Sequence, residues 1–317
     1  MIAGLSKLID WSAIHMAAAT MPRPDGRNQQ LAEALQLIDS PEFIPPDVKP
    51  AQVQFIGKDR LHFATPRPGP WVENNTVQGR IYRCAERWQE RPTVLLLHGW
   101  NDAIDHYVRF PSMARQLNRH GLNAATLEAP FHFQRRPRQL GAWSNFLCPD
   151  ILRVAEAARQ AVAETRAFAE WLRLQGCRAV GLMGISLGGW LGGLTVCHDN
   201  RFACAVFLVP VARLDVLVEQ AAFCRDIRQA WQGRPVATGR LNLTELRPVI
   251  PKENILLIEA IHDLFVPPAT TEELWRAWGQ PDIWRLPSGH ISVLYAPHLQ
   301  HRIIHWMAPR LLAHAAK

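Results

Sequence analysis

The sequence lacks the cysteine patterns that mark disulfide-rich and zinc-binding proteins. Its six cysteines show no C-x-x-C spacing, so neither a disulfide framework nor a metal site is indicated. They are Cys84, Cys148, Cys177, Cys197, Cys204 and Cys224. We expect most of them to be buried as small apolar residues. We also find no internal repeat and no low-complexity segment, and the sequence predicts a globular protein with no metal and no cofactor.

Long hydrophobic runs are also missing. Every apolar run is broken within about a dozen residues, which is short of the ~20 that a membrane-spanning helix needs. Lys7 and Asp10 interrupt the region in which a signal peptide would carry its apolar core. We therefore expect a retained N-terminus, a cytoplasmic protein and no transmembrane segment.

Positive charge is in excess, with a formal net charge of +7. The basic residues are scattered except in "QRRPRQ" at residues 134–139, and no nucleic-acid-binding module is recognisable. We predict no nucleic-acid partner. The excess charge favours an anionic partner, and an anionic small substrate or a lipid surface fits equally well. The oligomeric state is not indicated.

Residues 1–50 are predicted to form an N-terminal helical extension. Apolar residues between Leu5 and Ile14, and again between Leu31 and Ile38, lie near helical spacing, and the prolines of "PEFIPPDVKP" end the second helix. We expect this helix pair to pack on the main domain. Residues 51–317 then form that domain.

Strand and helix patterns alternate from Thr93 onward. The apolar runs "TVLLLHG", "LNAATLEAP", "RAVGLMG", "ACAVFLVPV" and "NILLIEAI" predict strands, preceded by two more near residues 61–65 and 77–83. Helices are expected over residues 107–120 and 150–175, the second capped by Asp150, and in a tail from about Ser292. The pattern predicts an α/β fold with a mostly parallel central sheet, helices on both faces and a small helical cap at residues 212–251.

Candidate functional residues follow several of these strands. His98, residues 134–139, Ser186, Asp215 and Asp263 each come just after an apolar run. Because ligands bind at the carboxyl ends of parallel strands, we expect these residues to gather at one edge of the sheet.

The segment Gly184–Gly188 reads G-I-S-L-G and lies between a predicted strand and a helix. This is the context that the G-x-S-x-G motif requires, in which the serine sits on a sharp, strained turn. Glycines without a Cβ let the strand and the helix approach closely enough to project the hydroxyl. Ser186 is therefore the candidate nucleophile.

A serine needs a base, and the base needs an acid to orient it. Asp263 in "IHDLFVPP" and His290 in "PSGHISVL" follow Ser186 in the order serine, acid, histidine. We predict Ser186, Asp263 and His290 as a catalytic triad. Asp215 is an alternative acid. Other candidates, for which structural roles are the default, are Glu259, His262, His298, His301 and His305.

Ester cleavage through a serine also needs two N–H groups for the oxyanion. We predict the N–H of Leu187, directly after the nucleophile, and that of Trp100, with Asn101 as its substitute. Asn101, Arg135 and Arg136 are predicted to bind substrate, the arginines through a carboxylate or phosphate. Trp100, Trp143 and Trp190 are the tryptophans expected nearest the site.

The motifs "VLLLHGW", "GISLGG", "HDLFVPP" and "GH" resemble the α/β-hydrolase superfamily over most of the chain from Thr93. The segment "EAPFHFQRRPRQLGAW" with the following helix and "GISLGGWLGGL" is similar to α/β-hydrolase-domain proteins formerly classed as a domain of unknown function. Eukaryotic members of that group are linked to mitochondrial phospholipid deacylation. The resemblance implies the α/β-hydrolase fold and assigns the triad to Ser186, Asp263 and His290.

These features predict a serine hydrolase that cleaves small-molecule carboxylic esters through an acyl-enzyme. An acyltransferase or a phospholipid or lysophospholipid deacylase would use the same triad. A peptidase is disfavoured because no propeller domain and no acidic pair for a substrate amino group is recognisable. From a different class, a ligand-binding relative without chemistry is the alternative, although such proteins usually lack a triad member.

Overall fold

The computed structural model describes residues 3–21, 31–140, 146–231 and 238–316. Within these ranges a nine-stranded sheet has the order β1-β2-β3-β5-β4-β6-β7-β8-β9. The strands are β1 (Gln54–Ile56), β2 (Arg60–Ala64), β3 (Thr76–Tyr82), β4 (Thr93–Leu97), β5 (Asn123–Leu127), β6 (Val180–Ile185), β7 (Phe202–Leu208), β8 (Ile255–Ala260) and β9 (Asp282–Leu286). The helices are α1 (Ala3–Thr20), α2 (Leu31–Asp39), α3 (Phe110–Arg119), α4 (Ile151–Leu174), α5 (Leu187–Val196), α6 (Leu214–Gln220), α7 (Arg225–Ala230), α8 (Pro268–Ala277) and α9 (Leu299–Ala315).

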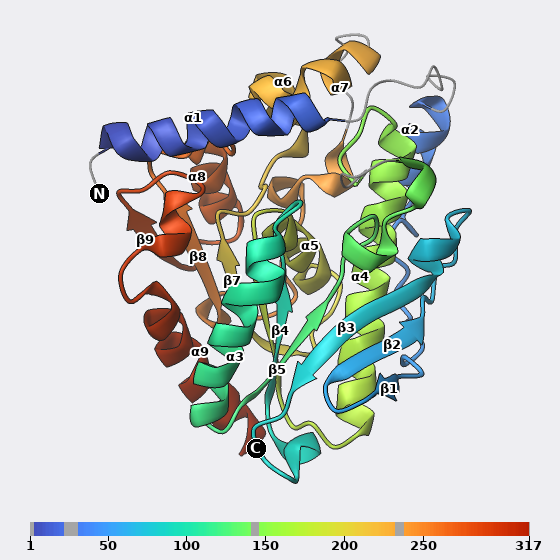
Figure 1. Cartoon of the computed structure of the whole chain (residues 1–317), viewed down its shortest axis with the longest axis vertical. Coiled ribbons are helices and arrows are strands. Elements are labelled where there is room, and N and C mark those ends of the chain that lie inside the picture. Colours follow the sequence, from blue (N-terminus) through green and yellow to red (C-terminus); the bar gives the residue numbers. More distant parts are fainter. Residues whose placement is uncertain (1–2, 22–30, 141–145, 232–237, 317) are drawn as a thin grey trace.

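The six strands from β5 to β9 in the sheet order are parallel, and β1, β2 and β3 add an antiparallel edge. Side chains alternate across the sheet as the strand period requires. Val94 and Leu96 pack in the apolar core beneath α3 and α9, whereas Leu95 and Leu97 pack in the core beneath α4 and α5 (Figure 1). The predicted mostly parallel sheet with helices on both faces is confirmed.

Helix α4 begins where the sequence predicts, because the Asp150 carboxylate accepts a hydrogen bond from the N–H of Arg153 at 3.2 Å. The helix expected over residues 107–120 differs at its start. Residues Asp105–Arg109 form one turn of π-helix, and the regular α3 follows. Asp105 and Arg109 form a buried ion pair across this turn.

Helix α1 packs only in part through the apolar residues that predict it. Leu5 and Leu8 are 51% and 58% exposed, whereas Ser6, Asp10 and Ile14 are buried. The helix lies across the carboxyl end of the sheet (Figure 1), where it packs against the turns at residues 222–224 and 292–295. Polar groups on its inner face therefore meet the loops that follow the strands.

The segment 212–251, for which the sequence predicts a cap, connects β7 to β8. Its described residues form α6, α7 and short 3₁₀ turns. No helix in the described ranges is long and apolar enough to cross a membrane. The six cysteines are free and five of them are buried, as expected.

Candidate active site

Ser186 occupies the turn between β6 and α5 with φ 52° and ψ −111°, a conformation that L-residues rarely adopt. The turn is tight because helix and strand nearly touch. A Cβ on Gly184 would collide with the backbone of Gly188, and a Cβ on Gly188 would collide with the carbonyl of Leu97. The strained strand-to-helix turn expected from G-x-S-x-G is therefore present, and both glycines are required for it.

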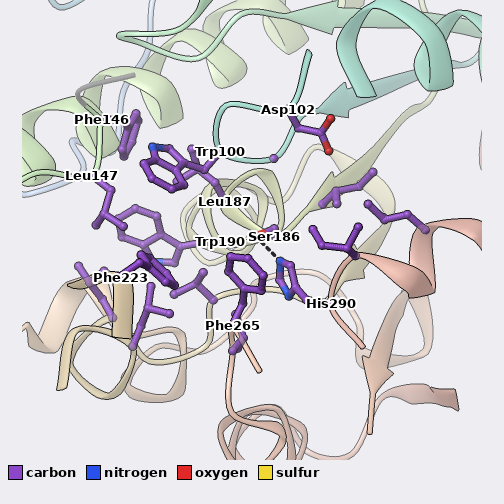
Figure 2. Close-up of a pocket in the computed structure, with 18 residues that line it drawn as sticks. Trp100, Asp102, Phe146, Leu147, Ser186, Leu187, Trp190, Phe223, Phe265 and His290 are labelled. Carbon is purple, nitrogen blue, oxygen red and sulfur yellow. Dashed lines mark hydrogen bonds between the residues drawn. The ribbon is translucent and has the colours of Figure 1, made fainter. Parts of the chain in front are cut away.

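Three side chains from three separate loops are in hydrogen-bond contact. The Nε2 atom of His290 lies 2.9 Å from the Oγ of Ser186 (Figure 2). Its Nδ1 lies 2.6 Å from the Oδ2 of Asp263. The other oxygen of Asp263 accepts hydrogen bonds from the N–H groups of Phe265 and Val266, both at 2.8 Å. The carboxylate is thus fixed by its own loop while it orients the imidazole.

The electrostatics of His290 suit a general base. Burial disfavours the charged imidazolium, but the Asp263 carboxylate and the charges of Asp10 and Asp102 outweigh burial and raise the pKa of His290 above its ordinary value. The ring of Phe265 lies against the imidazole at 4.9 Å between centroids. The imidazole is therefore held in a largely apolar setting beside the Asp263 carboxylate, whose own pKa burial raises.

The alternative acid does not reach the histidine. Asp215 lies in the first turn of α6 and forms a two-pronged ion pair with Arg213, at 2.9 and 2.7 Å. Glu259 pairs with Arg285 at 2.9 Å. Because Asp215 and Glu259 each pair with an arginine, Asp263 is the acid in contact with His290. The remaining histidine candidates lie elsewhere: His262 in the loop after β8, and the exposed His298, His301 and His305 at or within α9.

The two residues predicted to supply N–H groups to an oxyanion, Leu187 and Trp100, line the same cavity as Ser186. Within the described ranges, neither the N–H of Leu187 nor that of Trp100 has a hydrogen-bond acceptor. Leu187 is the first residue of α5, where the helix leaves its N–H groups free and its dipole favours negative charge. His98 connects the loop that carries Trp100 to the loop after β5, because its Nε2 accepts a hydrogen bond from the N–H of Ala129 at 3.0 Å. Burial lowers the pKa of His98 to about 4, which leaves Nε2 free to accept this bond.

A cavity of about 100 Å³ opens beside Ser186. Its walls are mostly apolar and come from the strand ends and from the cap segment, residues 212–251 (Figure 2). The apolar side chains include Trp100, Phe146, Leu147, Trp190, Leu214, Leu217, Phe223 and Phe265. Trp100 stacks on Phe223 at 6.0 Å, and the Nε1 of Trp190 donates to the carbonyl of Leu241 at 2.6 Å. Among the described residues of the wall, Asp102 is the one that carries a carboxyl group, and burial raises its pKa.

Sequence reasoning missed most of this cavity. Trp100 and Trp190 line it as expected, and Trp143 lies outside the described residues. Asn101 has φ 53° and is not part of the wall, so its role in substrate binding stays a prediction. Asp102 was not singled out, although its position two residues after Trp100 is a usable signal.

The prediction that Arg135 binds substrate is wrong. Its side chain is fully buried, and its guanidinium donates to both oxygens of Glu164 on α4, at 2.6 and 2.7 Å. Two further bonds reach the carbonyls of Glu128 and Asn74, at 2.6 and 2.7 Å. Arg136 is half-buried and also absent from the cavity wall. The loop turns back toward α4 because a buried guanidinium requires this carboxylate and these carbonyls.

Replacing Arg135 with alanine should therefore destabilise the fold. The change leaves Glu164 as an unpaired buried charge, and we expect the free energy of unfolding to fall by about 3–5 kcal/mol. Urea unfolding followed by circular dichroism measures the loss. Arg138→Ala, an exposed arginine of the same loop, is the control and should change stability by less than about 0.5 kcal/mol. A stable Arg135→Ala protein with a raised KM for anionic esters would restore the substrate-binding interpretation.

Two family models match the chain. The model described as alpha/beta hydrolase domain containing 18 matches residues 63–225, and the model of the prolyl oligopeptidase family matches residues 156–304. Two curated relatives from Mycobacterium tuberculosis, both described as uncharacterized proteins, are 30% identical over 240 residues. The match covers 71% of this chain and 57% of each relative, so the chain spans little more than half their length.

Solved structures share the fold at low sequence identity. Acetyl xylan esterase 1 from Thermoanaerobacterium sp. JW/SL YS485 superposes with a TM-score of 0.61 at 15% identity, covering 92% of this chain and 95% of that one. Acetyl xylan esterase from Paenibacillus sp. R4 gives 0.57 at 12% identity, covering 90% and 95%. A cold-adapted esterase from an Arctic intertidal metagenomic library gives 0.53 at 19% identity, covering 81% and 99%.

Proposed function

Because this chain belongs to the family of alpha/beta hydrolase domain containing 18, we propose that it is a serine hydrolase that cleaves carboxylic esters with an apolar acyl group. The observation that carries the proposal is the hydrogen-bonded series from Ser186 through His290 to Asp263 at the mouth of an apolar cavity. We propose Ser186 as the nucleophile, His290 as the base and Asp263 as the acid that orients it.

The reaction follows from these contacts. His290 Nε2 takes the proton of Ser186 as Oγ attacks the ester carbonyl carbon. The carbonyl oxygen then becomes an anion that accepts hydrogen bonds from the N–H groups of Leu187 and Trp100. The bond to the alcohol oxygen breaks as His290 returns the proton to it. Water then attacks the acyl-enzyme with His290 again as the base, which releases the carboxylic acid and restores Ser186.

The cavity supports an apolar acyl group over an anionic one. Its walls are aromatic and aliphatic, and the carboxyl group of Asp102 would repel a substrate carboxylate when it is ionised. None of the described residues on the wall is an arginine or lysine. The described wall therefore offers no arginine or lysine to pair with an anionic substrate, and the preference for anionic substrates that the net charge suggested is not part of the proposal.

A series of p-nitrophenyl esters of increasing acyl length tests this preference. Each methylene that enters the cavity contributes about 0.8 kcal/mol, so kcat/KM should rise by up to about fourfold per methylene until the cavity is full. A p-nitrophenyl ester with a terminal carboxylate on the acyl chain should be hydrolysed more slowly than its neutral equivalent. Equal rates for acetate and all longer esters would contradict the proposed acyl site.

A pair of matched variants assigns the effect to the cavity. Leu217 lines it from α6, and Leu217→Trp should reduce hydrolysis of the longer esters most and of the acetate ester least. Leu174 is 56% exposed at the end of α4, and Leu174→Trp is the control that should leave the profile unchanged. The same profile in both variants would place the acyl group elsewhere.

A further inference from the structure

Asp10 is a buried carboxylate in the N-terminal helix that no part of the proposed reaction uses. It lies on the inner face of α1 and is 0% exposed. A buried carboxylate is costly unless hydrogen bonds satisfy it. Its two oxygens accept hydrogen bonds from three backbone N–H groups, all of which belong to loops at the carboxyl end of the sheet.

These three donors are the backbone of the candidate catalytic loops. Oδ2 of Asp10 accepts from the N–H of His290 at 2.7 Å and from that of Leu264 at 3.1 Å, while Oδ1 accepts from the N–H of Ile291 at 3.0 Å. Leu264 directly follows Asp263. One carboxylate therefore binds the loop of the base and the loop of the acid together, across 280 residues of sequence.

The fit between the carboxylate and the histidine loop is close. A Cβ on Gly289 would lie 2.6 Å from Oδ2 and 2.9 Å from Oδ1 of Asp10, so only glycine permits the approach at this position. The same loop carries the imidazole whose Nε2 is 2.9 Å from the Ser186 hydroxyl. A shift of the loop would be transmitted directly to that contact.

We propose that Asp10 is a positioning residue for the reaction of Ser186, holding the His290 loop in register with the Asp263 loop through its three backbone hydrogen bonds. This inference rests on the proposed function. Asp10 touches neither the substrate cavity nor the serine, and it acts only through His290 and its neighbours. The N-terminal helix is then part of the catalytic assembly and not an accessory layer.

The charge of Asp10 acts on His290 in the same direction as two other carboxylates. Asp263 and Asp102 face the imidazole from the loops after β8 and β4, and all three raise the pKa of His290. On α1 itself the nearest charged residue is Lys7, which is exposed. Removing the Asp10 charge therefore destabilises the imidazolium and lowers the pKa of His290, so the acidic limb of kcat/KM moves to lower pH.

The test compares Asp10→Asn with Glu33→Gln, which removes one carboxylate charge from the exposed face of α2. In Asp10→Asn we expect kcat to fall by about 10- to 100-fold with KM changed by less than about threefold, since a misplaced base slows chemistry without emptying the cavity. The pKa of His290, followed by NMR of its imidazole, should fall. Glu33→Gln should match wild type in all three measurements.

Several results would overturn the proposal. They are an unchanged kcat, an unchanged pKa of His290 in folded Asp10→Asn, and a lower melting temperature as the sole effect. If Asp10→Asn does not fold, Asp10→Glu keeps the charge but adds a methylene where Gly289 leaves no room. A reduced kcat with an unchanged His290 pKa then supports the proposal, and wild-type kcat or failure of both variants to fold overturns it. Because the NMR titration needs no turnover, an inactive wild-type protein would refute the proposed function separately.

Discussion

Ser186→Ala should fold normally and lose ester hydrolysis by roughly 10⁵-fold or more in kcat. The alanine removes the atom that attacks the carbonyl, and only the oxyanion groups and the cavity then assist water, as in other triad enzymes without their serine. Alanine also fits the turn no worse than serine does, since both carry a Cβ at φ 52°. Initial rates with the best p-nitrophenyl ester, together with a thermal melt, measure the two parts of this prediction.

Ser12→Ala supplies the matched control for this change. Ser12 is exposed on α1, and its hydroxyl donates a hydrogen bond to the carbonyl of Leu8 in its own helix. Its variant should retain wild-type rates. If Ser186→Ala keeps activity within tenfold of wild type, the mechanism through this serine is wrong.

Asp263→Asn should reduce kcat by about 10³- to 10⁴-fold, somewhat less than loss of the serine. An amide at this position no longer stabilises the imidazolium and favours the wrong tautomer of His290, whose Nδ1 now lies 2.6 Å from a carboxylate oxygen. The variant should remain folded, because the amide oxygen still accepts from the N–H groups of Phe265 and Val266. Pre-steady-state release of p-nitrophenol measures the acylation step directly.

Asp215→Asn distinguishes between the two acids that follow the sheet. Asp215 has its own cationic partner in Arg213, and its side chain is 27% exposed. We expect its neutralisation to change kcat by less than about threefold. A strong loss of kcat in Asp215→Asn with little effect in Asp263→Asn would show that Asp263 is not the acid that orients His290.

The sheet and the neighbourhood of Ser186 could be predicted because short stretches of sequence indicate both. Apolar runs ending in glycine mark strands buried on both faces, and parallel strands bring the residues after them to one edge. Ser186 and Asp263 each follow a strand that is buried along its whole length, whereas His290 follows the partly exposed edge strand β9. Their chain order adds a constraint that Asp215 also satisfies, and the choice between the two acids required the structure.

The position of Arg135 and the role of Asp10 depend on contacts that no local pattern carries. Arg135 also follows a strand, but its guanidinium finds Glu164 on the next helix, and that buried pair turns the loop away from the cavity. Asp10 is one acidic residue in a helix whose outer face carries Leu5 and Leu8. The apolar residues on that outer face would suggest that it packs against the core. The burial of the Asp10 carboxylate is explained only by the backbone N–H groups of the loops after β8 and β9, to which it is hydrogen-bonded.

Labelling of the folded wild-type protein with a fluorophosphonate tests the central claim most directly, because the probe reacts with a serine only when a base activates it. The account predicts one adduct per chain, mapped by peptide mass spectrometry to Ser186, with no adduct after heat unfolding. The labelling rate should rise through the pH range in which His290 loses its proton. A folded protein that takes up no probe, or takes it up at another serine, would contradict the account and favour a ligand-binding member of the fold.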